Sequence, residues 1–141
     1  MDYIINPVAM GGIIKEIKNN NVKIHLHGRL GVITVDKKLI KFEDVLEVGH
    51  ILEFYFSYIQ VMEDPYDYDS SHILYEEMQP CLLGGKITQV NDTAIEVTIM
   101  DGLGTIAVPR RWAFTSIELK ENQDVEFYLS NMKVIGKKTL W

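Results

Sequence analysis

Apolar and polar residues alternate along most of this chain, and the alternation predicts short β-strands. The segments IIKEIK, VKIHL and LEFYFSYIQV, beginning at Ile13, Val22 and Leu52, are apolar at nearly every second position. This period is typical of half-buried strands, because successive side chains point to opposite faces. The asparagines at 19–21 favour a tight turn, so the first two segments form a predicted hairpin. No stretch of ten residues has helical spacing; the best candidate for a single turn is His72 to Met78.

The same pattern occurs a second time, at a constant offset and without a gap. GRLGVITVDKK, which begins at Gly28, corresponds to DGLGTIAVPRR, which begins at Asp101. The correspondence runs from Pro7 to Val61 in the first copy and from Pro80 to Val134 in the second. Self-similarity of this kind indicates two copies of one structural unit, so we predict an internal duplication. The predicted division is a first small β-barrel over residues 1–61, a connector over 62–78 and a second small β-barrel over 79–141.

Each copy is predicted to hold five short strands, which makes the chain all-β. A small sheet exposes its edges unless it closes on itself, so closure into a barrel is favoured. The predicted fold is therefore two tandem five-stranded β-barrels, OB-like or SH3-like, related by internal duplication. A unit of about sixty residues buries only about 60% of its unfolded surface. We therefore expect the two copies to pack on each other or on another chain.

Composition and charge are those of an ordinary soluble protein, with 47% hydrophobic and 24% charged residues among 141. The net charge of −6 is concentrated in the connector, where Met62 to Met78 contains six acidic residues and no Lys or Arg. Such a segment is predicted to be an exposed tether. The N-terminus does not have the pattern of a signal peptide, and no apolar run is long enough for a membrane span. We therefore expect a cytoplasmic protein that does not bind membranes.

Residues with catalytic potential are few. Cys81, the single cysteine, lies in an apolar run and is predicted to be a buried small hydrophobe rather than a nucleophile. His25 and His27 share the outward face of one predicted strand, but no third metal ligand at a fixed spacing accompanies them. The pair Gly11-Gly12 lacks the lysine and helix of a phosphate loop and is predicted to mark a bend or bulge. We expect no enzyme activity, no metal and no cofactor.

In the first copy, glycines and apolar residues follow the order Gly-x-Ile-x-x-Ile, then Val-x-Ile-x-Leu, then Gly-x-x-Gly-x-Ile and, after a loop, Leu-x-Val-Gly. This order resembles the S-one-type OB barrel, an RNA-binding repeat of a ribosomal small-subunit protein. In the first copy the matching positions are Gly12, Ile14, Ile17, Val22, Ile24, Leu26, Gly28, Gly31, Ile33, Leu46, Val48 and Gly49. The resemblance implies a barrel whose second and third strands carry rings that stack on bases. The positions expected to carry those rings are Asn21, Val32, Ala94 and Thr105, and none is aromatic.

Two further resemblances are local. The short motifs GRLG, VPRR and EFYLS are similar to motifs of small, uncharacterised bacterial domains. This resemblance implies no known activity. GTIAVPRR followed by NQDVEFYLSNMKVIGKK resembles the swapped-hairpin DNA-binding barrel of transition-state regulators. That family places a helix after the proline, where this chain has RRWAFTSIEL, a composition that does not favour a helix.

Two predicted surfaces could bind a partner. The first combines basic residues with a tryptophan, a pairing enriched at binding hot spots; its members are Arg29, Lys37, Lys38, Pro109, Arg110, Arg111 and Trp112. The alternative for Trp112 is that it caps its barrel, as Leu39 would in the first copy. The second surface is the outward face of the predicted strands that begin at Leu52 and Val125. It is a candidate contact between repeats or between chains. Its members are Glu53, Tyr55, Ser57, Glu126, Tyr128 and Ser130.

These features favour a non-catalytic interaction or assembly module that binds a protein partner or associates with itself. One alternative is an RNA or single-stranded nucleic-acid binder, as the OB resemblance implies. Another is a DNA-binding regulator of the swapped-hairpin type. A contiguous basic groove would favour nucleic acid, whereas an apolar patch with a polar rim would favour a protein partner.

Overall fold

The structure is a computed structural model that describes residues 5–74 and 78–138. In this part of the chain the regular elements are β-strands and short 3-10 turns, so the predicted all-β class is confirmed. The turn predicted at His72 to Met78 begins as a 3-10 helix, and its residues 75–77 lie outside the described residues. None of the described residues belongs to a helix long and apolar enough to cross a membrane.

Elements of the two repeats follow each other in the same order, at the offset that relates the two copies in the sequence. The first repeat forms β1 (Val8–Lys18), β2 (Asn21–Leu26), η1 (His27–Arg29), β3 (Val32–Asp36), η2 (Lys37–Leu39), β4 (Ile40–Lys41), β5 (His50–Phe56) and β6 (Ile59–Met62). The connector contains η3 (Ser71–Leu74). The second repeat forms β7 (Cys81–Val90), β8 (Ala94–Ile99), η4 (Met100–Gly102), β9 (Gly104–Pro109), η5 (Arg110–Trp112), β10 (Ala113–Phe114), β11 (Asp124–Leu129) and β12 (Met132–Lys137).

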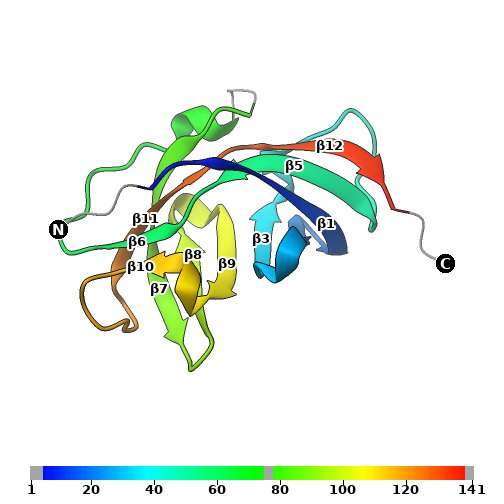
Figure 1. The fold of residues 1–141 in the computed structure, drawn as a ribbon. Coiled ribbons are helices and arrows are strands. Elements are labelled where there is room, and N and C mark those ends of the chain that lie inside the picture. Colours follow the sequence, from blue (N-terminus) through cyan, green and yellow to red (C-terminus); the bar gives the residue numbers. More distant parts are fainter. Residues whose placement is uncertain (1–4, 75–77, 139–141) are drawn as a thin grey trace.

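The two repeats exchange their last strands (Figure 1). β5 pairs with β1 of its own repeat, whereas β6 pairs with β11 and β10 of the other. In the same way, β11 pairs with β7, whereas β12 pairs with β5 and β4. Each set of paired strands therefore contains five strands of one repeat and one strand of the other. The predicted division at residues 61 and 79 describes the repeats in the sequence and not these sets of paired strands.

Two junctions join the sets into one sheet of twelve described strands. β3 pairs antiparallel with β9, and the register places Ile33 opposite Ile106. β5 meets β11 where Phe56 lies opposite Leu129. In both pairs the partners are equivalent positions of the two repeats, so each pair marks the approximate twofold axis that relates the repeats.

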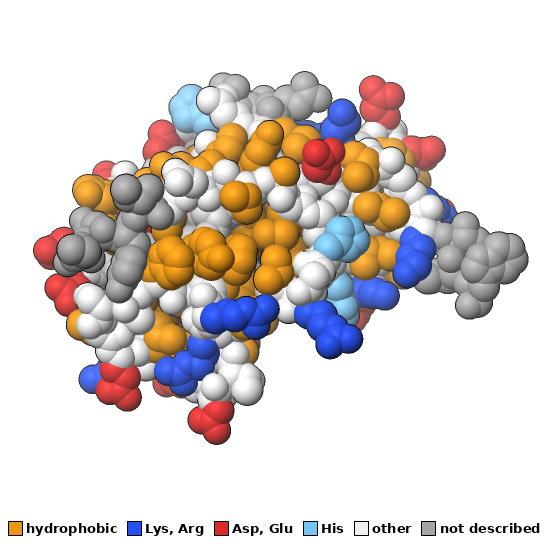
Figure 2. All heavy atoms as spheres, viewed as in Figure 1, with side chains coloured by type: hydrophobic (Ala, Val, Ile, Leu, Met, Phe, Trp, Pro, Cys, Tyr) orange, Lys and Arg blue, Asp and Glu red, His pale blue; other side chains and the backbone are white. Residues whose placement is uncertain are grey.

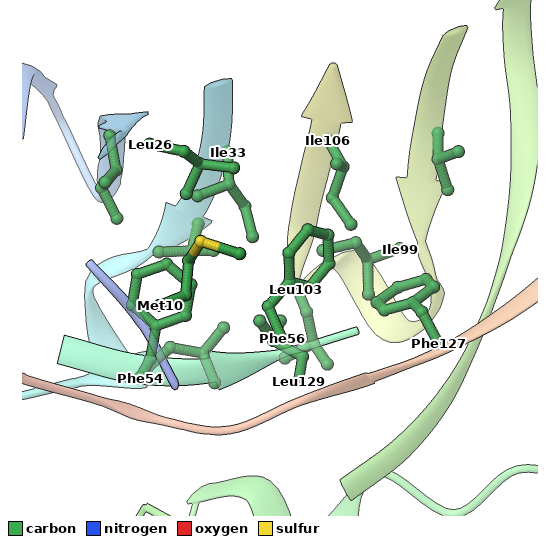
Figure 3. Close-up of a cluster of buried hydrophobic side chains, with 14 of the residues drawn as sticks. Met10, Leu26, Ile33, Phe54, Phe56, Ile99, Leu103, Ile106, Phe127 and Leu129 are labelled. Atoms are coloured by element: carbon green, nitrogen blue, oxygen red, sulfur yellow. The ribbon is translucent and has the colours of Figure 1, made fainter. Parts of the chain in front are cut away.

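The two repeats share one hydrophobic core. Buried side chains of both repeats belong to a single cluster (Figure 3), in which the rings of Phe56 in β5 and Phe127 in β11 lie 6.2 Å apart between centroids. Neither small repeat could bury this much apolar surface alone. The predicted packing of the copies on each other is therefore so close that their cores merge.

The irregularity predicted at the glycine pairs lies a few residues further on. The register of β1 with β2 shifts between Ile14 and Glu16, and that of β7 with β8 shifts between Ile87 and Gln89. The glycines serve close packing instead, since a Cβ on Gly12 would lie 2.6 Å from Cγ2 of Ile24. The prediction of a bulge at the glycine pair itself is therefore wrong.

Two equivalent glycines, Gly31 of GRLG and Gly104 of DGLG, make the junction of β3 with β9 possible. Gly31 and Gly104 have φ angles of 114° and 151°, a region that side chains disfavour. A Cβ on Gly31 would lie 2.1 Å from the carbonyl oxygen of Ala107, and one on Gly104 would lie 2.0 Å from that of Thr34. Any side chain at either position would force the two strands apart.

We therefore predict that Gly31→Ala and Gly104→Ala each lower the free energy of unfolding by more than about 2 kcal/mol, because strain and a backbone clash add. The control is Gly136→Ala, where the nearest atom to the new Cβ is Cδ1 of Ile51 at 4.0 Å. Its effect should stay within about 1 kcal/mol. Urea unfolding of the three variants measures the difference, and equal effects would contradict the described junction.

Candidate interaction surfaces

Trp112 is buried, with 7% of its surface exposed. Its indole Nε1 donates a hydrogen bond to the carbonyl oxygen of Ser57 at 2.9 Å. Its ring stacks on Tyr58, with ring centroids 4.0 Å apart, and lies 6.0 Å from Phe56. The prediction of an exposed binding anchor is therefore wrong. The alternative interpretation, that Trp112 caps its barrel as Leu39 does in the first repeat, agrees with the structure, since Leu39 is fully buried.

Trp112 contacts the segment in which the first repeat passes its last strand to the second. Ser57 and Tyr58 are the two residues between β5 and β6, where the chain passes from one set of paired strands to the other. Pro109 ends β9 and precedes the single turn of η5, which carries Trp112. Trp112 thus holds the crossing from the side of the second repeat.

The predicted basic residues lie at different ends of the junction between β3 and β9. Because the two strands are antiparallel, η1 with Arg29 and η5 with Arg110 and Arg111 lie at one end (Figure 1). Lys37 and Lys38 follow β3 at the other end, where η2 contacts η3. Figure 2 shows Lys and Arg side chains along the lower part of one face, below a band of hydrophobic side chains.

The residues predicted to form an outward surface lie on β5 and β11 or directly after them, close to the point where the two strands meet. Ser57 and Ser130 are fully buried and Glu126 is nearly so, so the prediction of an exposed surface is wrong for these three. The Ser130 Oγ accepts a hydrogen bond from the backbone N–H of Tyr55, and the Ser57 Oγ accepts one from that of Tyr128, both at 2.8 Å. Glu53, like the two tyrosines, is half-buried.

Each of these serine hydroxyls also donates a hydrogen bond. The Ser57 Oγ donates to the carbonyl oxygen of Tyr58, and the Ser130 Oγ donates to that of Asn131, both at 2.8 Å. A hydroxyl supplies one donor and two acceptor sites, so a buried serine can satisfy backbone groups of both strands at once. Serine at both positions therefore has a structural use within the chain.

The connector docks on the second repeat instead of hanging free. The ring of Tyr68 covers Gly84, where a Cβ would lie 2.5 Å from the ring. Its hydroxyl donates to Oε1 of Glu126 at 2.7 Å. Ile73 enters the core, and the side-chain amide of Asn131 donates to its carbonyl oxygen at 3.0 Å. The prediction of a tether is wrong for this part of the connector, because Tyr68 and Ile73 make packing contacts with the second repeat and the core.

A pocket of about 460 Å³ lies beside the docked segment. Tyr66 and Tyr68 form one wall, and Lys86 and Asp124, 3.3 Å apart, lie on the strands below. Burial and the hydrogen bond to Glu126 raise the pKa of Tyr68 above its ordinary value of 10.0, so its hydroxyl is a hydrogen-bond donor at neutral pH.

A groove of about 810 Å³ was not predicted from the sequence. It lies between β12 and the loop after β4, and its walls include Phe42, Met78 and Val134. The same loop exposes large apolar side chains at Phe42, Val45 and Val48. The signal in the sequence was four apolar residues within KFEDVLEVG, a segment that joins two predicted strands. Of these four, Leu46 packs against the core, and the other three are exposed.

The groups with catalytic potential lie apart. Cys81 is half-buried, and burial together with the nearby Asp69 raises the pKa of its thiol, the opposite of what activates a nucleophile. The His27 ring covers Gly11, where a Cβ would lie 2.5 Å from its Cδ2 atom. Among the described residues, no three His, Cys, Asp or Glu side chains are grouped so that they could hold a metal ion.

Comparison with known proteins gives few matches. No family model and no curated protein matches the chain. Among solved structures, a similar chain is the cytoplasmic molybdate-binding protein ModG in a PEG-grown crystal form with molybdate bound. The two chains are 19% identical, the alignment covers 89% of this chain and 92% of that one, and the TM-score is 0.28. A TM-score of this size supports no inference about a site or a ligand.

We predict that Trp112→Ala lowers the free energy of unfolding by about 3–5 kcal/mol, since it removes a buried ring. Trp112→Phe keeps most of the packing and loses the hydrogen bond to Ser57, so it should cost about 1–3 kcal/mol. The matched control is Ile117→Ala in the exposed loop after β10, where a change within about 1 kcal/mol is expected. If Trp112→Ala unfolded at the same urea concentration as the parent chain, the buried position of the ring would be wrong.

Proposed function

We propose that the chain is a non-catalytic protein-binding module and that the groove beside β12 belongs to its partner-facing surface. The observation that carries the proposal is the loop of residues 42–48, which exposes Phe42, Val45 and Val48 at the edge of that groove. Contiguous exposed apolar side chains with a charged rim are typical of protein interaction sites. The cytoplasmic location expected from the sequence belongs to the same proposal.

The geometry of the loop supports this use. Val45, near the middle of the loop, has 74% of its surface exposed, the largest value among the large apolar residues that the structure describes. Phe42 packs edge-on against the ring of His50, 5.0 Å between centroids, which holds the base of the loop in place. Glu47 is bonded to Lys137 of β12, a second anchor. A held loop with an exposed apolar tip loses little conformational entropy on binding.

The neighbouring strand edge offers backbone groups as well. β4 pairs with β12 at Met132 and Lys133, and in the described part of the chain no further pairing covers that edge of β12. An extended segment of a partner can add to such an edge by backbone hydrogen bonds while its side chains enter the groove. This mode fits a protein or a second copy of the chain better than a small molecule.

Nucleic-acid binding is the second candidate, and the observation in its favour is the grouping of Arg29 with Arg110 and Arg111 at one end of the β3–β9 junction. It has less support, because Trp112 is buried and the positions expected to stack on bases are Asn21, Val32, Ala94 and Thr105. The DNA-binding regulator has less support still, since a single 3-10 turn and a short strand follow Pro109 where that family has a helix.

A photo-crosslinking amino acid tests the proposal when it is placed at Val45 and, as the control, at Ile117 on the equivalent loop of the second repeat. We expect protein adducts, with a partner or with a second copy, at Val45 and about tenfold fewer at Ile117. Val45→Asp should weaken capture of the crosslinked partner at least about tenfold, as truncation of a hot spot does. Adducts of RNA or DNA, or equal adducts at both positions, would contradict it.

A further inference from the structure

The two sets of paired strands present equivalent outer faces. Strand register places Glu53 between Gly11 and Lys133 in the first set, and Glu126 between Gly84 and Gln60 in the second. We define outer face 1 as Gly11, His25, His27, Glu53 and Lys133. Outer face 2 consists of their counterparts in the other repeat, Gln60, Gly84, Thr98, Met100 and Glu126.

Outer face 2 is covered by the chain itself. The Tyr68 ring lies over Gly84 and its hydroxyl donates to Glu126, which also accepts a hydrogen bond from Nε2 of Gln60 at 3.0 Å. As a result, the carboxylate of Glu126 is buried with two donors. An extended segment centred on a tyrosine is thus the natural occupant of this face.

The residues that flank Tyr68 fix its direction on the face. Asp67 and Tyr68 line the same pocket as Thr98 of β8, and the Ser70 hydroxyl donates to Asp101 of η4 at 2.6 Å. The segment therefore runs from the second strand of the repeat toward the turn that follows it.

In the described part of the chain, no extended segment lies over outer face 1, although the ring of its own His27 covers Gly11. Ile135 has 55% of its surface exposed, whereas its counterpart Met62 has 8%. Lys133 is exposed and Glu53 is half-buried, whereas Gln60 is buried. The face that has an occupant in one half of the molecule is therefore accessible in the other half.

The two faces differ in charge. Outer face 1 carries basic or titratable groups where outer face 2 is neutral, so it suits a more acidic occupant. The substitutions between the faces are His25 for Thr98, His27 for Met100 and Lys133 for Gln60. In the turn that follows the second strand of each repeat, Arg29 likewise stands where the other repeat has Gly102.

We propose that outer face 1 binds an acidic, tyrosine-centred segment of a partner protein in extended form, as outer face 2 binds Asp67-Tyr68-Asp69. The tyrosine hydroxyl of the partner donates to Glu53. The carboxylate before it lies near His25, the counterpart of Thr98, and the one after it lies near Arg29. The inference rests on the proposed protein-binding function and names the chemistry of a partner.

His27 gives outer face 1 its own contact for the incoming ring. Its imidazole covers Gly11, whereas on outer face 2 Tyr68 covers Gly84 and the Met100 sulfur accepts from the Gly84 N–H. The partner's tyrosine packs against this imidazole, since aromatic pairs attract in offset or edge-on arrangements. His27 thus supplies one side of the site, and Glu53 supplies the hydrogen-bond acceptor.

The test uses the full chain and the synthetic peptide DPYDYDSS, the sequence of residues 64–71, as the probe. The chain's own connector competes at outer face 2 with a high effective concentration, so the free peptide reports on outer face 1. In a titration followed by amide NMR shifts we expect binding below about 1 mM, with shifts at Gly11, Glu53 and Lys133. Lys133→Glu should weaken it about fivefold or more, whereas Lys120→Glu, the same charge change elsewhere, should not.

A peptide in which both tyrosines are alanine should lose the binding, which separates recognition from charge alone. The inference is overturned by absence of binding at about 1 mM peptide, by shifts confined to β7 and β11, or by equal weakening in the two lysine variants. Failure of the proposed function is distinguishable, because it is decided by the adducts at Val45. Protein adducts there without peptide binding would refute only the outer-face site, and peptide binding without adducts would refute only the groove.

Discussion

The point where β5 meets β11 and the chain changes from one set of paired strands to the other determines the rest of the architecture. At this point β5 gives way to β6 and β11 gives way to β12, and each chain segment leaves its own repeat for the other. Backbone groups at a crossing cannot all find partners in a regular ladder, and an unpaired buried N–H group is costly. The hydroxyls of Ser57 and Ser130 solve this by accepting from the N–H groups of Tyr128 and Tyr55. The merged core and the β3–β9 junction depend on strands held in this exchanged order.

The connector makes the two halves of a nearly symmetric molecule different, because it docks on the second repeat alone. Its Tyr68 covers the outer face on one side and its Ile73 fills part of the core. On the matching side, no described segment covers Ile135 and Lys133, which are exposed. The groove at Phe42 and the exposed tip at Val45 belong to that open side as well. The second repeat thus carries the docked connector, and we propose that the first repeat faces the partner.

The sequence allowed the element order to be predicted because a constant offset between the copies and an alternation of apolar with polar residues are both visible in the chain itself. It did not reveal the exchange, since LEFYFSYIQV reads as one strand and periodicity does not say which strand a segment pairs with. Trp112 had two interpretations, because Arg and Trp beside a proline fit a binding loop and a cap equally well. Tyr68 was missed because acidic neighbours suggested exposure, although a single ring over a glycine was enough to dock the segment.

The central claim is that exchanged strands make the two repeats one folding unit. The most direct test is cleavage of the connector at the exposed bond between Asp64 and Pro65. This cut breaks the covalent link between the repeats and leaves every pairing of β6 and β12 in place. We expect the two fragments to stay associated and to unfold in urea in one transition whose midpoint rises with protein concentration. Fragments that separate into two folded monomers would contradict the account.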